Sequence, residues 1–173
     1  MNSITTKERL DLSSKRTYPM ILVDEQPLDI WLNRRCPEED LGTLVPTLLP
    51  WLEETEDRKL VWGRLNALGN TSVAVPLLMG AGDTDLWLTI IIVEMVQTET
   101  SILWSRIGIE WGEEAEMPYS IGTDVYWLEA IPALEFDKKQ HQQVLQVFNQ
   151  LMQQEELDKL SDDATQRSSR FFV

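Results

Sequence analysis

The residue types that carry most catalytic and metal-binding chemistry are scarce in this chain, which has one histidine, His141, and one cysteine, Cys36. A catalytic histidine needs a nucleophile or an acid within hydrogen-bond reach, and no motif such as G-x-S-x-G supplies one. A structural zinc site needs more ligands than one Cys and one His can provide. The sequence therefore predicts no metal, no cofactor and no catalytic dyad. His141 is expected on the solvent side of a helix, and Cys36 as a buried or inert thiol.

Asp83 and Asp85 follow two glycines at a spacing that partly matches a calcium-binding loop. The remaining ligands and the closing Glu of such a loop are missing, so the segment predicts only the connection into the next strand. Gly80-Ala81-Gly82 is not followed by a helical pattern, which excludes a phosphate-binding loop. An enzyme stays an alternative only if carboxylates such as Asp83, Asp85 and Glu94 converge in three dimensions.

Tryptophan and arginine recur two residues apart, first as Trp62 and Arg64 and then as Trp104 and Arg106. Residues two apart share one face of a strand, and both segments have a strand-like composition. In one interpretation the two arginines, braced by the tryptophans, grip an anionic group through their forked donors. In the other, the arginine stems cover partly exposed tryptophans and pair with local carboxylates.

The chain carries a net charge of −14 over 173 residues, which argues against binding to nucleic acid or to an anionic membrane surface. A basic protein is the natural partner for such a charge, although acidity alone also promotes solubility. A dense acidic stretch that also holds aromatic side chains follows residue 109. It is either a solvated loop or a surface that binds a basic protein. The candidate partner-binding residues are Glu110, Trp111, Glu113, Glu114, Glu116 and Tyr119.

These residues must be positioned by a fold whose centre is the stretch from Asp85 to Trp111. Two runs rich in β-branched and aromatic residues flank Thr98–Thr100, which predicts a hairpin of strands 86–96 and 102–110. Both faces of the first run are apolar, so it should be a central strand that is covered on both sides.

A C-terminal helix is predicted over residues 138–153, with Asp137 as its N-cap and an apolar stripe that includes Val144, Phe148 and Leu151. A short helix is expected to begin at Leu28 and to end before Cys36. Further strands are predicted at 18–23, 59–68, 72–79 and 125–131.

Consecutive strands with short connections form an antiparallel meander, so the predicted fold class is α+β. Short N-terminal helices and the long C-terminal helix, packed on the sheet, complete it. The expected organisation is a polar leader at 1–17, a single domain at 18–160 and a flexible tail at 161–173. The N-terminal stretch lacks the apolar core of a signal peptide, which favours the cytoplasm.

A small, acidic, Trp-rich α+β domain without catalytic signatures resembles the immunity proteins of bacterial polymorphic toxin systems. The stretches that carry the resemblance are Leu41–Leu52, the two Trp-x-Arg segments and Glu110–Glu116. The resemblance implies a non-catalytic protein that binds and neutralises a basic cognate toxin domain. An adaptor or chaperone for another partner, and the carboxylate enzyme described above, are the alternatives.

Overall fold

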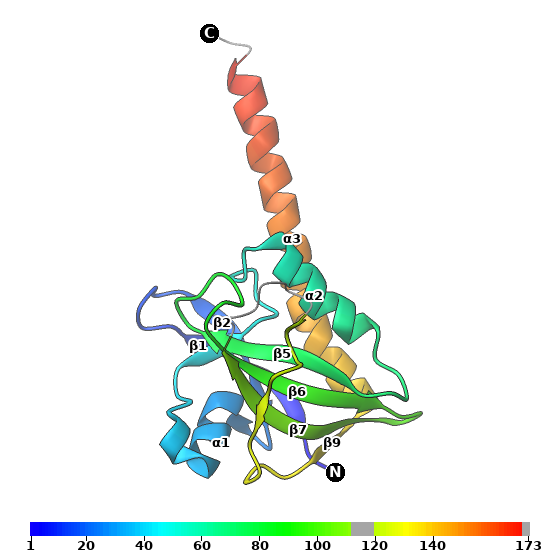
Figure 1. Cartoon of the computed structure of the whole chain (residues 1–173). Coiled ribbons are helices and arrows are strands. Elements are labelled where there is room, and N and C mark those ends of the chain that lie inside the picture. Colours follow the sequence, from blue (N-terminus) through cyan, green and yellow to red (C-terminus); the bar gives the residue numbers. More distant parts are fainter. Residues whose placement is uncertain (112–119, 171–173) are drawn as a thin grey trace.

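The fold is α+β, as predicted, and the described residues form two antiparallel sheets, two short helices and one long C-terminal helix (Figure 1). The structure is a computed structural model that describes residues 1–111 and 120–170. The small sheet has the order β1 (Ile4–Leu10), β2 (Thr17–Val23) and β3 (Gln26–Pro27). The large sheet has the order β4 (Leu44–Pro46), β5 (Val73–Gly80), β6 (Thr89–Gln97), β7 (Ser101–Trp111) and β8 (Tyr126–Trp127), and β9 (Leu134–Asp137) pairs with the opposite end of β7.

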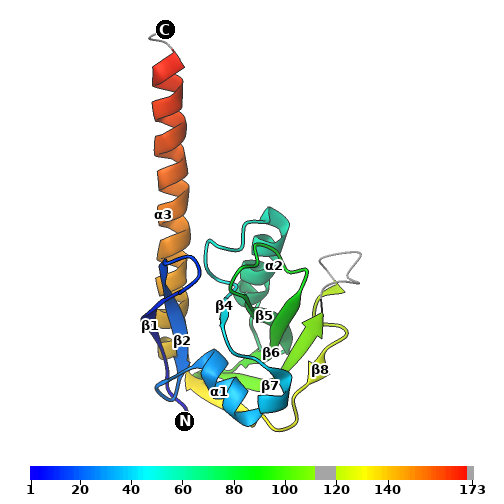
Figure 2. The ribbon, with the colours of Figure 1, turned by 90° about the vertical axis from the view of Figure 1, so that its left-hand side faces the viewer.

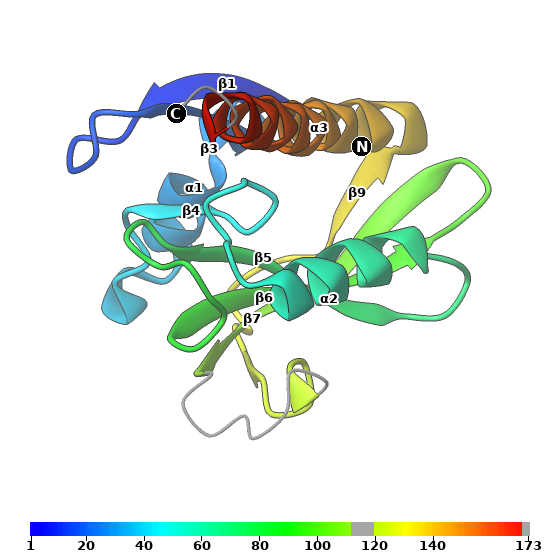
Figure 3. The same ribbon diagram turned by 90° about the horizontal axis from the view of Figure 1, so that it is seen from above.

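The helices are α1 (Leu28–Arg35), α2 (Thr55–Asn66) and α3 (Lys138–Arg170), and a 3-10 turn, η1 (Pro37–Glu39), follows α1. The small sheet and α3 lie on one side of the molecule, and α1 and β4 lie in the middle (Figures 2 and 3). The rest of the large sheet lies on the other side, where α2 packs along β5. A single apolar core links both sheets and all three helices.

The β6–β7 hairpin is the centre of the large sheet, which confirms the prediction. The two strands pair antiparallel from Thr89 with Trp111 to Gln97 with Ile102, with an irregularity next to Glu94. Successive residues of β6 point to opposite faces, and the buried side chains belong to both: Ile90, Ile91, Ile92 and Val93. The strand is therefore covered on both sides, although residues 86–88 form bends rather than its first residues.

Residues 59–68 are not a strand, because all but the last two lie in α2. The buried side chains of this segment are Leu60, Val61 and Leu65, and their spacing places them on one side of a helix. Acidic residues in the first turn, Glu56 and Asp57, interact favourably with the helix dipole. The composition suggested a strand because so short an apolar pattern fits both the two-residue period of a strand and the 3.6-residue period of a helix.

The predicted polar leader contains a strand, because all seven residues of β1 pair with β2, from Ile4 with Val23 to Leu10 with Thr17. The strand was not predicted because its composition is polar. β1 is an edge strand with one fully buried residue, Ile4. Downstream, the strand predicted at 125–131 is only the short β8, and β9 was not predicted.

α3 begins as predicted and ends much later. Asp137 Oδ1 accepts hydrogen bonds from the backbone N–H groups of Lys139 (2.9 Å) and Gln140 (3.1 Å), so it is the N-cap. Val144 and Phe148 are buried, and the helix lies along β1. The helix continues to Arg170 because no Gly or Pro interrupts the sequence, so the predicted helix end at residue 153 is wrong.

A partly buried ion pair joins the small sheet to the large one. Arg9 of β1 donates from its two terminal nitrogens to the carboxylate of Asp29 on α1, at 2.9 and 2.8 Å, and Asp29 is 1% exposed. Both side chains also form hydrogen bonds with the backbone of Leu44. Arg9 donates to the Leu44 carbonyl (3.0 Å), and Asp29 accepts from the Leu44 N–H (3.3 Å). Burial lowers the pKa of Arg9, but hydrogen bonds with Asp29 and Tyr18 outweigh this and raise it. β1, α1 and β4 therefore meet at one point.

We expect Arg9→Ala to lower the free energy of unfolding by about 3–5 kcal/mol, because it leaves the Asp29 carboxylate buried without its cation. Lys7→Ala, an exposed position on the same strand, should change it by less than about 0.5 kcal/mol. Urea denaturation followed by circular dichroism measures both. Equal losses for the two variants would contradict a special role for the ion pair.

Candidate functional site

A pocket of about 550 Å³ opens at one end of the large sheet. Because neighbouring strands are antiparallel, the start of β4, the end of β5, the start of β6 and the end of β7 lie together there. Leu44 pairs with Gly80, and Thr89 pairs with Trp111. The loop 39–43 and the loop 80–83 complete the wall.

Three carboxylates line this pocket: Glu39, Asp40 and Asp83. No Lys, Arg or His is among its lining residues, and none of the three carboxylates belongs to an ion pair within the described part of the chain. Burial raises the pKa of Asp83, and the negative charge of the nearby Asp85 raises it further. A hydrogen bond from the Gly80 N–H acts in the opposite direction and lowers this pKa. A cation inside the pocket would therefore be attracted by negative charge that no cation among the described lining residues balances.

The loop 39–43 is held in an unusual backbone conformation. Asp40 has φ 50° and Thr43 has φ 62°, a region that a β-branched residue such as Thr rarely adopts. Leu41 anchors the loop, since its side chain is buried and its N–H donates to Asn33 Oδ1 at 3.0 Å. Strain of this kind persists where the surroundings enforce it, and it is concentrated at functional sites.

Exposed apolar side chains surround this end of the sheet. Trp111 is 55% exposed, and it lies on the same strand face as Ile109, which lines the pocket. Tyr126 of β8 stands opposite Ile109 and is also largely exposed. Large exposed apolar side chains that gather at one place mark interaction sites. We call the exposed side chains together with the pocket carboxylates the Trp111 surface: Leu88, Trp111, Tyr126, Glu39, Asp40 and Asp83.

The predicted partner-binding residues are therefore separated by the structure. Trp111 is exposed, but Glu110 is buried, and its carboxylate accepts hydrogen bonds from the N–H groups of Gly122 (2.6 Å) and Asp124 (3.4 Å). Arg64 of α2 adds an electrostatic interaction with Glu110. Glu110 thus holds the turn 120–124 in place. The other predicted residues, Glu113, Glu114, Glu116 and Tyr119, lie outside the described residues.

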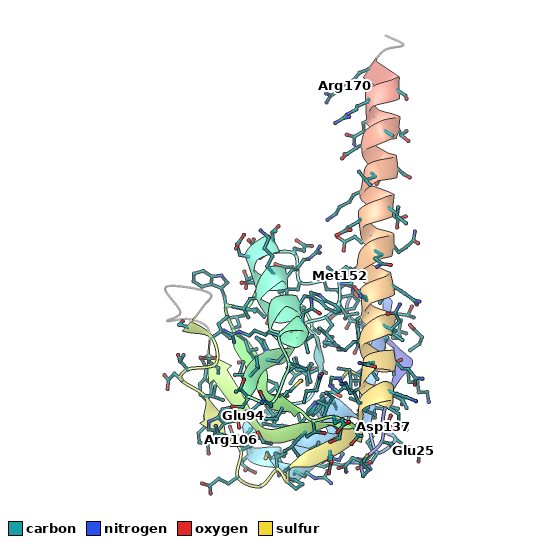
Figure 4. The ribbon with its side chains drawn as sticks, turned by 90° about the vertical axis from the view of Figure 1, so that its right-hand side faces the viewer. Glu25, Glu94, Arg106, Asp137, Met152 and Arg170 are labelled. Carbon is teal, nitrogen blue, oxygen red and sulfur yellow. The ribbon has the colours of Figure 1, made fainter. Side chains whose placement is uncertain are left out.

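The two Trp-x-Arg segments do not form one surface. Arg64 lies on a helix and donates to the carbonyl of Ala74 at 2.8 Å. Arg106 forms an ion pair with Glu94 at 2.6 Å (Figure 4). Its guanidinium carbon lies 4.1 Å from the ring centre of Trp127. The hydrogen bond from Arg106 lowers the pKa of Glu94. Pairing with a local carboxylate, the second interpretation, therefore describes Arg106.

Glu94 does not converge with Asp83 and Asp85, so the three carboxylates of the enzyme alternative do not form one site. Asp83 lines the pocket, Asp85 accepts a hydrogen bond from the Trp87 N–H, and Glu94 pairs with Arg106. Across residues 1–111 and 120–170, no group of three or more His, Cys, Asp or Glu side chains is arranged to hold a metal ion.

His141 is buried, so its predicted position on the solvent side of α3 is wrong. Its Nε2 accepts a hydrogen bond from the Trp104 indole N–H at 3.3 Å, and its ring also faces Phe136. Burial lowers the pKa of His141 to about 4. Cys36 is buried, as predicted, and burial raises the pKa of its thiol, which disfavours the reactive thiolate.

Comparison with protein-family models, with curated proteins and with solved structures finds no match to this chain. Of the helices in the described ranges, none has the length and apolar character needed to cross a membrane.

We expect acid to destabilise the protein through His141. The unfolded chain binds a proton near pH 6.5 and the folded protein only near pH 4, so this contribution to stability is complete above pH 6.5. It is lost as the pH falls from 6.5 to 4, by roughly 3 kcal/mol in total. His141→Gln keeps an acceptor for the Trp104 N–H and removes the titration. Chemical denaturation of both proteins between pH 7 and 4 tests this, and parallel losses in the two proteins would show that another group is responsible.

Proposed function

We propose that this protein is a cytoplasmic, non-catalytic binding protein whose partner is a basic protein. In this proposal the chain is an immunity protein, and the partner is the toxin domain that it neutralises. The observation that supports this proposal is the Trp111 surface. It combines a pocket lined by Glu39, Asp40 and Asp83 with an exposed tryptophan at its edge. The charge of −14 on the whole chain also attracts a basic partner.

The pocket suits a lysine or arginine side chain of the partner. Its volume of about 550 Å³ exceeds the size of one such side chain, and its carboxylates supply acceptors for the cationic head. The walls also contain Leu88, Ile109 and Trp111, against which an aliphatic stem can pack. A cation bound there would compensate the unfavourable charge on Asp83.

The aromatic side chains supply the second half of the interaction. Interfaces are anchored by a few well-packed residues, among which tryptophan and tyrosine are enriched. Charges at the edge of an interface mainly accelerate association, whereas the anchors slow dissociation. An adaptor or chaperone for another basic protein would use the same surface, so the identity of the partner separates these alternatives.

We expect Trp111→Ala to weaken binding by about 2 kcal/mol or more, seen mainly as faster dissociation. The triple variant Glu39→Gln, Asp40→Asn and Asp83→Asn should also dissociate faster, because it removes the acceptors inside the pocket. Converting Glu113, Glu114 and Glu116 to Gln should mainly slow association, with a smaller effect at higher salt. The probe is the basic protein that the immobilised full chain captures from native cell extract, identified by mass spectrometry and purified for kinetics at two ionic strengths.

The matched control removes three exposed carboxylates elsewhere, with Glu25, Glu129 and Glu135 each changed to Gln. It has the same net charge as the pocket variant and should leave the dissociation rate unchanged. If the pocket variant and Trp111→Ala behave like this control, the partner binds at another surface. Capture of an acidic protein alone, or activity of the captured protein unaffected by this chain, would count against neutralisation of a basic toxin.

A further inference from the structure

The last part of α3, residues 156–170, projects beyond the rest of the protein as a free helical arm (Figures 2 and 4). Just before it, Glu155 forms an ion pair with Arg58 of α2 at 3.2 Å. Every residue of the arm is exposed. The first half of α3 is therefore attached to the body. Beyond the first turn of the arm, where Glu156 and Lys159 line a hollow beside α2, no described residue covers the arm.

The arm carries an apolar stripe that faces away from the body. Leu157 is 58% exposed and Leu160 is 66% exposed, and Ala164 follows at the next position of the same helix face. At about 100° per residue, Leu157 lies roughly 180° around the helix from the buried Phe148. The stripe cannot turn onto its own body without unwinding α3. Its alternating spacing of three and four residues is that of a coiled-coil seam.

The arm's own sequence gives it little stability as an isolated helix. It contains residues of low helix propensity, among them Ser161, Asp162, Asp163 and Thr165. A helix of this length is marginal in water without tertiary contacts. Burial of Leu157 and Leu160 against another helix would supply the missing stabilisation.

We propose that the arms of two copies of this chain pair antiparallel along this stripe. With the pairing centred near residue 162, Leu160 packs against Ala164 of the second copy. Leu157 then packs on the aliphatic stem of the second copy's Arg167. Glu156, which flanks the seam, lies beside the second copy's Arg170. The two-fold symmetry of the pair repeats this ion pair, so it forms twice.

The charges along the arm favour this occupant. The half nearer the body is acidic, because Glu156, Asp158, Asp162 and Asp163 outnumber Lys159, which pairs with Glu155. The far end is basic, through Arg167 and Arg170. A helix with segregated charge complements itself only when the second copy runs in the opposite direction. A parallel pair would bury Arg167 against Arg167 and leave Glu156 beside uncharged residues. The antiparallel pair has one unfavourable contact, because Asp163 lies near Asp163 of the second copy. The position is exposed, so salt screens the repulsion between the two carboxylates.

The seam is short and partly polar, so the dimer should be weak and depend on protein concentration. Sedimentation equilibrium of the full chain at low salt, up to millimolar concentration, should show reversible dimerisation. Glu156→Arg and Arg170→Glu should each weaken association at least about fivefold, because each turns two attractions into repulsions. An equal mixture of these two variants should associate again, as should the double variant, because both restore the opposite charges.

Two controls isolate the seam. Asp158→Arg makes the same charge change as Glu156→Arg at a position that points away from the seam, and Trp111→Ala alters the other surface, so both should dimerise at least as well as the wild type. Circular dichroism verifies that each variant is folded. A wild type that stays monomeric over the whole range, or a dimer that the charge reversals leave unchanged or that the mixture fails to restore, overturns the proposal. The stripe would then bind a different protein, or the dimer would use another surface.

Discussion

The arrangement of this protein depends on the pairing of Arg9 with the buried carboxylate of Asp29. β1 contributes little apolar surface, yet it is the strand on which α3 lies. The ion pair fixes β1 against α1, and its bonds to the Leu44 backbone carry the constraint to the first strand of the large sheet. A buried ion pair contributes less to stability than to the choice of one arrangement, because other packings would leave its charges unpaired. We therefore regard it as the contact that sets how the two sheets meet.

The same pair also shapes the candidate site. Asp29 accepts a hydrogen bond from Leu44, which follows directly after the loop 39–43, and Asn33 on the same helix holds Leu41. The left-handed conformations of Asp40 and Thr43 are thus enforced by contacts with α1. The backbone of this wall is therefore attached to α1, and the Asp83 carboxylate is positioned by the hydrogen bond from the Gly80 N–H. Such preorganisation lowers the entropic cost of binding.

Local patterns in the sequence were sufficient for the elements that carry their own signal. The β6–β7 hairpin has a continuous apolar run on each side of a turn, and Asp137 precedes an uninterrupted helical stripe. β1 could not be predicted because its key residue, Arg9, is polar and its partner is distant in sequence. His141 could have been placed correctly, since it lies three and seven residues before Val144 and Phe148, on the face that they define; the glutamines around it obscured this.

The candidate site was harder to foresee than the fold. Trp111 was predicted from its own segment, but the pocket beside it is assembled from the ends of four strands, and no local pattern links Glu39 with Asp83. Glu110 shows the limit of reasoning from composition. It is adjacent to Trp111, but neighbouring residues of a strand point in opposite directions, so the two side chains serve different purposes.

None of the residues that line the pocket belongs to α3, and the arm is exposed along its whole length. The two surfaces can therefore be occupied at the same time. A pair of copies joined through their arms would be bivalent, with two Trp111 surfaces on one particle. Against a partner that is itself repeated or clustered, the second contact would form at a high effective concentration, and modest affinity at each pocket would become tight retention.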